Sequence, residues 1–262
     1  MTSPDPLLAL NLSVDYTGKP GVLKNAALQI NRGEVLGLVG QSGSGKSTLA
    51  LAISRLLSPA TARCTGEILF QNRDLMALSE QEMREVRGRE IGLVLQSPLS
   101  SLNPSLRVGT QLMEAWRAHA DGPRDKARTY QLDVLKSVSL PADESFLRRY
   151  PRQLSVGLAQ RVLVAMSILH RPALLIADEP TSALDAITAS EILQLFGQLN
   201  QDLKMTILYV SHDLLSIASL CHRVAILHEG EIVECAKTEQ IFRSPAHPYT
   251  RRLIAALPKN PF

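Results

Sequence analysis

The stretch from Gly40 to Thr48 has residue types and a spacing that could hold the phosphate groups of a nucleotide. It fits the pattern G-x-x-x-x-G-K-S/T, follows an apolar run and precedes a helical repeat of apolar residues. Backbone N–H groups that turn together toward an anion need positive φ angles, which glycine adopts readily. Lys46 would bind between the β- and γ-phosphates and the Ser47 hydroxyl would ligate Mg²⁺, whereas the alternative is a turn that binds nothing. The residues concerned are Gly40, Gln41, Ser42, Gly43, Ser44, Gly45, Lys46, Ser47 and Thr48.

A pair of acidic residues, Asp178 and Glu179, comes directly after the apolar run 173–177. Such a run predicts a strand of a parallel sheet covered on both faces, and open α/β sheets bind ligands at the carboxyl ends of these strands. We therefore predict that Asp178 holds the hydration shell of Mg²⁺. Glu179 would polarise an attacking water as general base, an effect worth about 10²–10⁴-fold in rate. The alternative for an isolated acidic pair is a solvated turn.

Two further polar residues end predicted buried strands in the same way. Gln96 follows the run 91–95, and its amide could reach both Mg²⁺ and the attacking water. His212 follows the run 206–210, and its imidazole could contact the γ-phosphate. Alone, each would be a hydrogen-bonded polar residue at a strand end. Their shared position predicts that both face one crevice with Glu179.

Tyr16 begins a turn-rich segment, 16–21, between the predicted strands 7–14 and 22–30. A ring at this place could stack on a nucleotide base. The sequence equally allows a tyrosine that packs in the core or on an edge strand.

The composition narrows the class of protein. The 262 residues are 45% hydrophobic, which suffices for a core, and the formal net charge is +3. So small a charge argues against a nucleic-acid-binding surface over the whole protein. Three cysteines, Cys64, Cys221 and Cys235, lack a paired spacing and are expected to be reduced thiols of a cytosolic protein. No uncharged apolar run approaches the roughly 18–20 residues that cross a bilayer, and residues 1–5 lack signal-peptide features, so the chain is not expected to enter a membrane by itself.

The elements that must position these residues alternate between strands and helices. Residues 97–158 differ, because prolines interrupt their start and helical spacing follows, which predicts an all-helical insertion. Ser155 is the expected N-cap of the helix that comes next. Beyond those already named, we predict strands at 66–70, 224–227 and 231–233 and helices at 79–89, 109–120, 126–138, 154–169 and 187–203, with a short helix in the tail 245–262.

The motifs and their order resemble the ATP-binding subunits of ABC transporters over nearly the whole chain. Tyr16 matches the adenine-stacking aromatic of that family. Residues 96–104 and 247–253 look like segments of its oligopeptide, dipeptide and nickel importer branch. The Walker A, Q-loop, signature, Walker B, D-loop and switch-histidine motifs of the family match, in order, Gly40–Thr48, Gln96, Leu154-Ser155-Val156-Gly157-Leu158, Leu174–Glu179, Ser182-Ala183-Leu184-Asp185 and His212.

This resemblance implies an α/β fold of the P-loop NTPase type. Its core sheet would be mostly parallel, with an N-terminal antiparallel β subdomain and an inserted all-helical subdomain. We expect residues 1–262 to form a single ABC-type ATP-binding domain. Its parts would be a nucleotide-binding core at 1–96 and 159–240, a helical subdomain at 97–158 and a short C-terminal extension at 241–262.

The resemblance also implies partners. A second ABC ATP-binding subunit would meet this chain head to tail, with each ATP and its Mg²⁺ between the phosphate loop of one chain and the signature of the other. Closure on ATP would drive two transmembrane permease subunits, which an extracytoplasmic solute-binding protein supplies. The chain would then lie peripherally on the cytoplasmic face of the inner membrane, with Gln96 and the helical insertion facing the permease. Peptides are the expected solute, and nickel or another small solute is the alternative.

One residue departs from the family pattern. Val156 occupies the first glycine of the Leu-Ser-Gly-Gly-Gln signature, and Leu158 occupies the glutamine. A branched side chain there would stand close to a γ-phosphate, and a positive φ would add roughly 1–2 kcal/mol of strain. We therefore expect an asymmetric heterodimer in which the site that uses Val156 turns over weakly.

Two other classes of function are possible for such a nucleotide site. A nucleic-acid or translation-associated ATPase of the same superfamily usually carries two such domains or a long coiled-coil insertion, and no nucleic acid is expected as a partner here. A P-loop kinase would phosphorylate a small metabolite, but it does not explain Ser155, Asp185 and His212 together.

Overall fold

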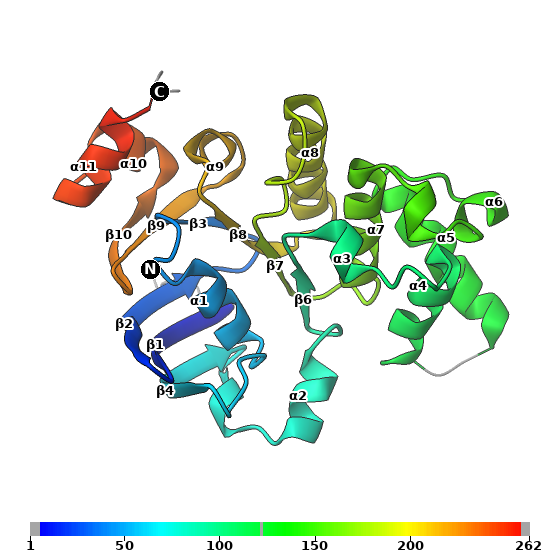
Figure 1. Ribbon diagram of the computed structural model, residues 1–262, viewed down its shortest axis with the longest axis horizontal. Coiled ribbons are helices and arrows are strands. Elements are labelled where there is room, and N and C mark those ends of the chain that lie inside the picture. Colours follow the sequence, from blue (N-terminus) through cyan, green and yellow to red (C-terminus); the bar gives the residue numbers. More distant parts are fainter. Residues whose placement is uncertain (1–5, 121–122, 258–262) are drawn as a thin grey trace. The chain divides into compact units, whose positions relative to one another are not determined.

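The computed structural model describes residues 6–120 and 123–257, which form two compact units (Figure 1). Unit 1 comprises residues 1–83 and 206–262, and unit 2 comprises residues 84–205. The expectations for residues 1–5 and 258–262 lie outside the described part of the chain. The predicted division into a core, a helical subdomain and a C-terminal extension stays a prediction.

Unit 1 contains an antiparallel sheet of strand order β2-β1-β4-β5. Buried residues alternate with more exposed ones along β1, as expected for a sheet with one face on the core. Tyr16 of β1 pairs with Lys19 of β2, so the turn consists of two residues and the predicted turn over 16–21 is too long. Gly18 makes the tight turn possible because its φ is 77°. The strands are β1 Leu8–Tyr16, β2 Lys19–Ile30, β4 Ala62–Phe70 and β5 Arg73–Asp74.

A second set of strands in unit 1 leads to the phosphate loop. Strand β3 pairs in parallel with β8 and β9, and β10 pairs antiparallel with β9 as the predicted terminal hairpin. Every residue of β3 and β8 is buried, which agrees with parallel strands covered on both faces. The elements are β3 Val35–Val39, α1 Lys46–Ile53, η1 Leu75–Ala77, β8 Thr206–Ser211, α9 Leu214–Leu220, β9 Arg223–His228, β10 Glu231–Lys237, α10 Thr238–Arg243 and α11 Pro248–Ala255.

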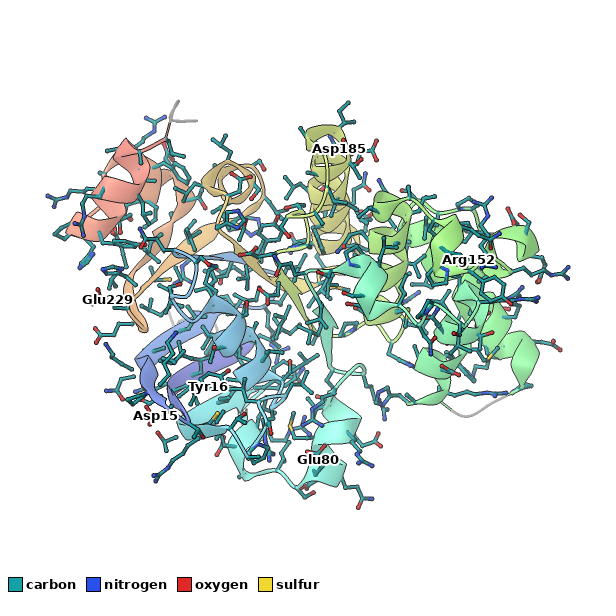
Figure 2. The ribbon with its side chains drawn as sticks, viewed as in Figure 1. Asp15, Tyr16, Glu80, Arg152, Asp185 and Glu229 are labelled. Carbon is teal, nitrogen blue, oxygen red and sulfur yellow. The ribbon has the colours of Figure 1, made fainter. Side chains whose placement is uncertain are left out.

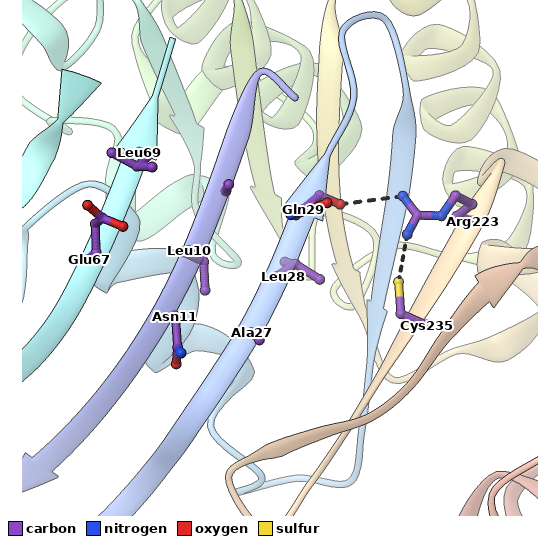
Figure 3. A pocket seen from close by; sticks show the side chains of 10 residues that line it. Leu10, Asn11, Ala27, Leu28, Gln29, Glu67, Leu69, Arg223 and Cys235 are labelled. Atoms are coloured by element: carbon purple, nitrogen blue, oxygen red, sulfur yellow. Dashed lines mark hydrogen bonds between the residues drawn. The ribbon is translucent and has the colours of Figure 1, made fainter. Parts of the chain in front are cut away.

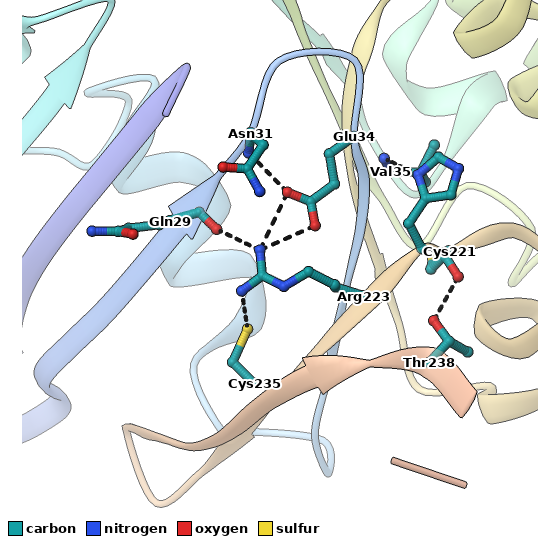
Figure 4. Close-up of polar contacts among 9 residues, drawn as sticks. Gln29, Asn31, Glu34, Val35, Cys221, Arg223, Cys235 and Thr238 are labelled. Carbon is teal, nitrogen blue, oxygen red and sulfur yellow. Dashed lines mark hydrogen bonds and ion pairs between the residues drawn. The ribbon is translucent and has the colours of Figure 1, made fainter. Parts of the chain in front are cut away.

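An ion pair fixes the residue that precedes β3 (Figure 4). The buried carboxylate of Glu34 accepts hydrogen bonds from Arg223 Nη1 at 3.1 and 3.2 Å and from the Asn31 backbone N–H at 2.8 Å. Arg223 also donates to the Gln29 carbonyl at 3.4 Å and to Cys235 Sγ at 3.1 Å. The guanidinium thus binds β2, the residue before β3 and β10 at once, and so it fixes the start of β3, the strand that leads to the phosphate loop.

The same arginine borders a groove of about 480 Å³ on the face of the antiparallel sheet (Figure 3). Side chains of β1, β2 and β4 line it, and none of the residues 40–48 does. The groove is therefore separate from the phosphate loop.

Unit 2 combines two parallel strands with most of the helices. Strand β6 pairs with β7, and Val94 lies opposite Ala177 near their carboxyl ends. The helical insertion is confirmed by α4 and α5, and two short helices, α3 and α6, were not predicted. The elements are β6 Ile91–Val94, α3 Pro98–Ser101, α4 Val108–Arg117, α5 Arg124–Ser137, α6 Glu144–Leu147, η2 Pro151–Gln153, α7 Val156–Ile168, β7 Leu174–Asp178 and α8 Ala186–Leu203, while α2 Glu80–Val86 spans the boundary with unit 1.

Candidate active site

The phosphate loop joins β3 to α1 as the motif requires. Gly43 and Gly45 have φ values of 78° and 107°, and Gly45 is the N-cap of α1. A Cβ atom on Gly40 would lie 2.3 Å from the Leu227 carbonyl oxygen and 2.6 Å from Ser44 Oγ. A side chain is thus sterically excluded at Gly40 and disfavoured at Gly43 and Gly45 by their positive φ values, which are the glycine conformations that an anion-binding loop needs.

The polar side chains of the loop fit a magnesium–triphosphate ligand. Lys46 is 5% exposed, and its Nζ donates to the carbonyls of Gly40 at 2.8 Å and Gln41 at 3.2 Å. The buried Ser44 Oγ has no hydrogen-bond partner among the described residues. Ser47, at the second position of α1, is exposed. An ammonium held on the loop, an unsatisfied hydroxyl and the positive end of a helix are groups that phosphate oxygens can use.

Tyr16 lies at the carboxyl end of β1, and its hydroxyl oxygen is 3.4 Å from Thr48 Oγ1 in α1 (Figure 2). The Gly21 N–H donates to Asp15 Oδ1 at 2.6 Å and fixes the strand next to the turn. A partly exposed ring is therefore tied to the helix that begins at the phosphate loop.

His212 also lies beside this loop. Val39 of β3 pairs with Ser211 of β8. Gly40 directly follows Val39 and His212 directly follows Ser211, so both residues come just after the same pair. His212 is exposed, and Asp213 caps α9 by accepting from the Leu215 N–H at 2.9 Å. Unit 1 thus brings together Tyr16, the phosphate loop and His212.

Unit 2 brings together the predicted base and the predicted amide. Asp178 is the last residue of β7 and is 6% exposed, and Glu179 follows it directly. Gln96 Nε2 donates to Glu179 Oε2 at 3.1 Å. Glu179 has a φ of 47°, an uncommon conformation for a non-glycine residue, and its carbonyl accepts hydrogen bonds from Ser182. The turn after β7 therefore orients the carboxylate toward the amide and connects it to the D-loop.

The signature segment begins helix α7. Ser155 is its N-cap, as predicted, and its Oγ accepts from the Leu158 N–H at 3.3 Å. Val156 is the first helical residue and does not have the positive φ that would strain a valine. The conditional strain argument therefore does not apply, because helical φ values are negative and suit valine. A Cβ on Gly157 would lie 2.5 Å from Thr188 Cγ2, so this glycine lets α7 approach α8 closely.

The D-loop ends in a capping network that the sequence alone did not reveal. Asp185 Oδ1 accepts from the N–H groups of Ile187 at 3.1 Å and Thr188 at 3.0 Å (Figure 2). Thr188 Oγ1 donates to Asp185 Oδ2 at 2.7 Å. The backbone hydrogen bond from Thr188 is the largest of the effects that hold the pKa of Asp185 below 3.8. The sequence signal was an Asp followed three residues later by a threonine at the start of a helix.

No group of three or more His, Cys, Asp or Glu side chains among the described residues is arranged to hold a metal ion. Every helix in the described part of the chain is too short or too polar to span a bilayer.

The loop, the strand order and the helical insertion define this protein as an α/β P-loop NTPase. Residues 23–182, more than half of the chain, match the family model described as ABC transporter. The chain belongs to this family. Residues 233–261 match a second model, described as the oligopeptide/dipeptide transporter C-terminal region.

Relatives and solved structures agree with this assignment. The glutathione import ATP-binding protein GsiA of Salmonella typhimurium is 43% identical over 258 residues, and the match covers 95% of this chain but only 41% of that relative. Among solved structures, cbiO1 from Clostridium perfringens, part of the ABC transporter complex cbiONQ, gives a TM-score of 0.79 at 29% identity and covers 97% of this chain and 96% of its own. The ATP-binding cassette MJ0796, in a dimeric post-hydrolysis state bound to ADP and Pi, gives 0.76 at 31% identity and covers 88% and 98%.

Proposed function

We propose that this chain hydrolyses ATP and thereby powers the import of a small solute, namely a peptide, through separate membrane permease subunits. The observation that carries the proposal is the phosphate loop, whose glycine conformations and buried Lys46 suit a triphosphate. The hydrogen bond between Gln96 and Glu179 supports a hydrolytic role, because an oriented carboxylate is what a general base requires.

In this proposal each predicted residue has a role toward one nucleotide. Tyr16 stacks on the adenine, Lys46 and the loop N–H groups bind the phosphates, and Ser47, Gln96 and Asp178 hold Mg²⁺. The metal would neutralise charge that develops on the phosphate oxygens. Glu179 accepts a proton from the attacking water, and His212 contacts the γ-phosphate.

The partners are part of the proposal. The signature of this chain would contact the ATP bound by a second ATP-binding subunit, and the D-loop would lie beside the signature. The signature residues are Leu154, Ser155, Val156, Gly157 and Leu158, and the D-loop residues are Ser182, Ala183, Leu184 and Asp185. Two permease subunits and, indirectly, a solute-binding protein would complete the importer at the cytoplasmic face of the membrane. Support comes from residues 233–261, which match a peptide-transporter region, and from a relative whose name states glutathione import. Nickel import remains the alternative by the same mechanism.

A binding and turnover experiment on the full chain with its partner subunit tests the proposal. With Mg²⁺ and a non-hydrolysable ATP analogue, calorimetry should detect binding to the wild type. Binding to Lys46→Ala should weaken about 10- to 100-fold, because a charge-assisted hydrogen bond contributes about 1.5–3 kcal/mol. Glu179→Gln should bind normally but hydrolyse ATP at least about 100-fold more slowly.

The same assay separates the competing functions. Phosphate release without any added acceptor indicates a hydrolase, whereas a small-molecule kinase needs an acceptor other than water. Absence of analogue binding to the wild-type complex would contradict the proposal.

A further inference from the structure

The β9–β10 hairpin lies against the first residue of the phosphate loop. The carbonyl oxygen of Leu227 in β9 would be 2.3 Å from a Cβ atom on Gly40, a distance that real side chains do not show. The two backbones are therefore in direct contact at the point where β3 ends. A displacement of the hairpin at Leu227 would move, or release, the start of the loop.

The turn of the hairpin reaches the other end of the loop through β2. The Lys24 N–H donates to the Gly230 carbonyl at 2.8 Å, and a Cβ on Gly230 would lie 2.7 Å from the Val22 carbonyl oxygen. The same Val22 oxygen would be 2.9 Å from a Cβ on Gly45. The turn that contains Glu229 and Gly230 therefore packs on the segment that borders the N-cap of α1 (Figure 2).

An aromatic contact joins helix α11 to this hairpin. The ring of Tyr249 stacks on the ring of His228, the last residue of β9, with centroids 3.6 Å apart and an interplanar angle of 14°. Tyr249 is 4% exposed, and its buried hydroxyl has no hydrogen-bond partner among the described residues. The contact thus depends on the ring and not on the hydroxyl.

The start of α11 is attached to the same hairpin by a carboxylate. Glu234 of β10 accepts hydrogen bonds from the backbone N–H groups of Ala246 at 2.8 Å and His247 at 3.0 Å. His247 is the N-cap of α11, and its Nδ1 accepts from the Tyr249 N–H at 3.2 Å. The helix is therefore held at its first turn, with Tyr249 directed onto His228.

We propose that helix α11 positions the phosphate loop, with Tyr249 acting through His228 and the β9–β10 hairpin as a positioning residue for nucleotide binding. This inference rests on the proposed function, since the nucleotide is the ATP of that proposal. It gives the C-terminal region a role within this chain: the helix stabilises the hairpin, and the hairpin contacts the loop next to both Gly40 and Gly45.

The test compares Tyr249→Ala with Tyr249→Phe in the full chain. Tyr249→Phe keeps the ring, so binding of the non-hydrolysable ATP analogue with Mg²⁺ should stay within two-fold of wild type. Tyr249→Ala should raise the dissociation constant at least five-fold. Without nucleotide, it should also speed amide hydrogen exchange in residues 40–48. Tyr130→Ala, at a half-exposed tyrosine of α5 in unit 2, should change neither quantity.

A second variant keeps the inference testable if Tyr249→Ala does not fold. Glu234→Gln keeps the Tyr249 ring and weakens only the attachment of α11, so it should produce a smaller change of both quantities in the same direction. If either variant frees residues 245–257 to exchange while residues 40–48 and the dissociation constant stay as in wild type, the inference is wrong. Failure of the wild type to bind the analogue would instead contradict the proposed function. The inference would still be tested in that case, because amide exchange of residues 40–48 is measured without nucleotide.

Discussion

The residue proposed as the general base, Glu179, has an unusual backbone conformation. It is left-handed, with a φ of 47°, and the Glu179 carboxylate accepts a hydrogen bond from Gln96 Nε2. A hydrogen bond to a charged group contributes about 1.5–3 kcal/mol, so this amide does much to hold the base in one orientation.

Removal of the amide tests that contribution. Gln96→Ala is expected to lower the rate of ATP hydrolysis about 10- to 100-fold, while binding of the non-hydrolysable analogue should weaken by a smaller factor, because Gln96 is also a proposed Mg²⁺ ligand. Steady-state phosphate release and calorimetry on the same preparation provide the two measurements. An equal loss of binding and turnover would show that Gln96 acts on the nucleotide and not through Glu179.

Replacement of Val156 by glycine is expected to affect stability and not the ATPase rate. Because Val156 is the first residue of α7 and lacks a positive φ, its replacement by glycine relieves no strain. Val156→Gly should lower the free energy of unfolding by up to about 1 kcal/mol, the usual cost of glycine in a helix. The ATPase rate of the complex should not rise more than two-fold. A large gain in rate would support the expectation that the valine side chain impairs the site it serves.

At the scale of elements, the contact between α7 and α8 depends on a missing side chain. A Cβ on Gly157 would lie 2.5 Å from Thr188 Cγ2, and this methyl group is not at the end of a flexible side chain. Gly157→Ala should therefore lower the free energy of unfolding by about 1–3 kcal/mol. Adding Thr188→Ser, which removes the methyl group and keeps the hydroxyl for Asp185, should restore most of it. Denaturant unfolding of the four proteins in this cycle measures the coupling, and simple additivity would contradict the contact.

The attachment of α11 should depend on pH. Burial alone would raise the pKa of Glu234, but hydrogen bonds to its carboxylate outweigh burial and hold the pKa below 4.5. A lowered pKa means that the attachment is complete above the ordinary carboxyl pKa and is lost as pH falls through the lowered value.

The amide NMR signals of Ala246 and His247 report on this attachment. They should titrate together with a midpoint below 4.5, and Glu234→Gln should remove that transition. A midpoint above 4.5 in the wild type would show that burial outweighs these donors.

The strands and helices that carry the motifs were predictable because their signals are local. The apolar runs of β3, β7 and β8 and the capping serine of α7 each identify an element without reference to the rest of the chain. The proximity of Gln96 to Glu179 also followed, since parallel strands end at one edge. The stacking of Tyr249 on His228 and the fit of Gly157 to Thr188 did not, because such contacts depend on packing between segments distant in sequence.

At the scale of the whole molecule, the residues of the proposed reaction come from distant parts of the sequence. The phosphate loop, Tyr16 and His212 belong to unit 1, whereas Gln96, Asp178 and Glu179 belong to unit 2. Each unit also contains a buried side chain that can report on the unfolding of that unit. Cys221 in unit 1 is 7% exposed, and burial raises the pKa of its thiol, so it should react slowly until the unit opens. Trp116, the single tryptophan of the chain, is 3% exposed in unit 2.

These two probes measure how far the nucleotide stabilises the molecule. With Mg²⁺ and the non-hydrolysable analogue at 100 times its dissociation constant, mass action should raise the free energy of unfolding by about 2.7 kcal/mol. Denaturant series followed by Cys221 alkylation and by Trp116 fluorescence should both shift, because Lys46 and Asp178 are both proposed to bind the nucleotide. At the same analogue concentration, Lys46→Ala should lose about half or more of both shifts. A shift of the Cys221 transition alone would confine the nucleotide to unit 1 and contradict the assignment of Asp178 and Glu179 to the same reaction.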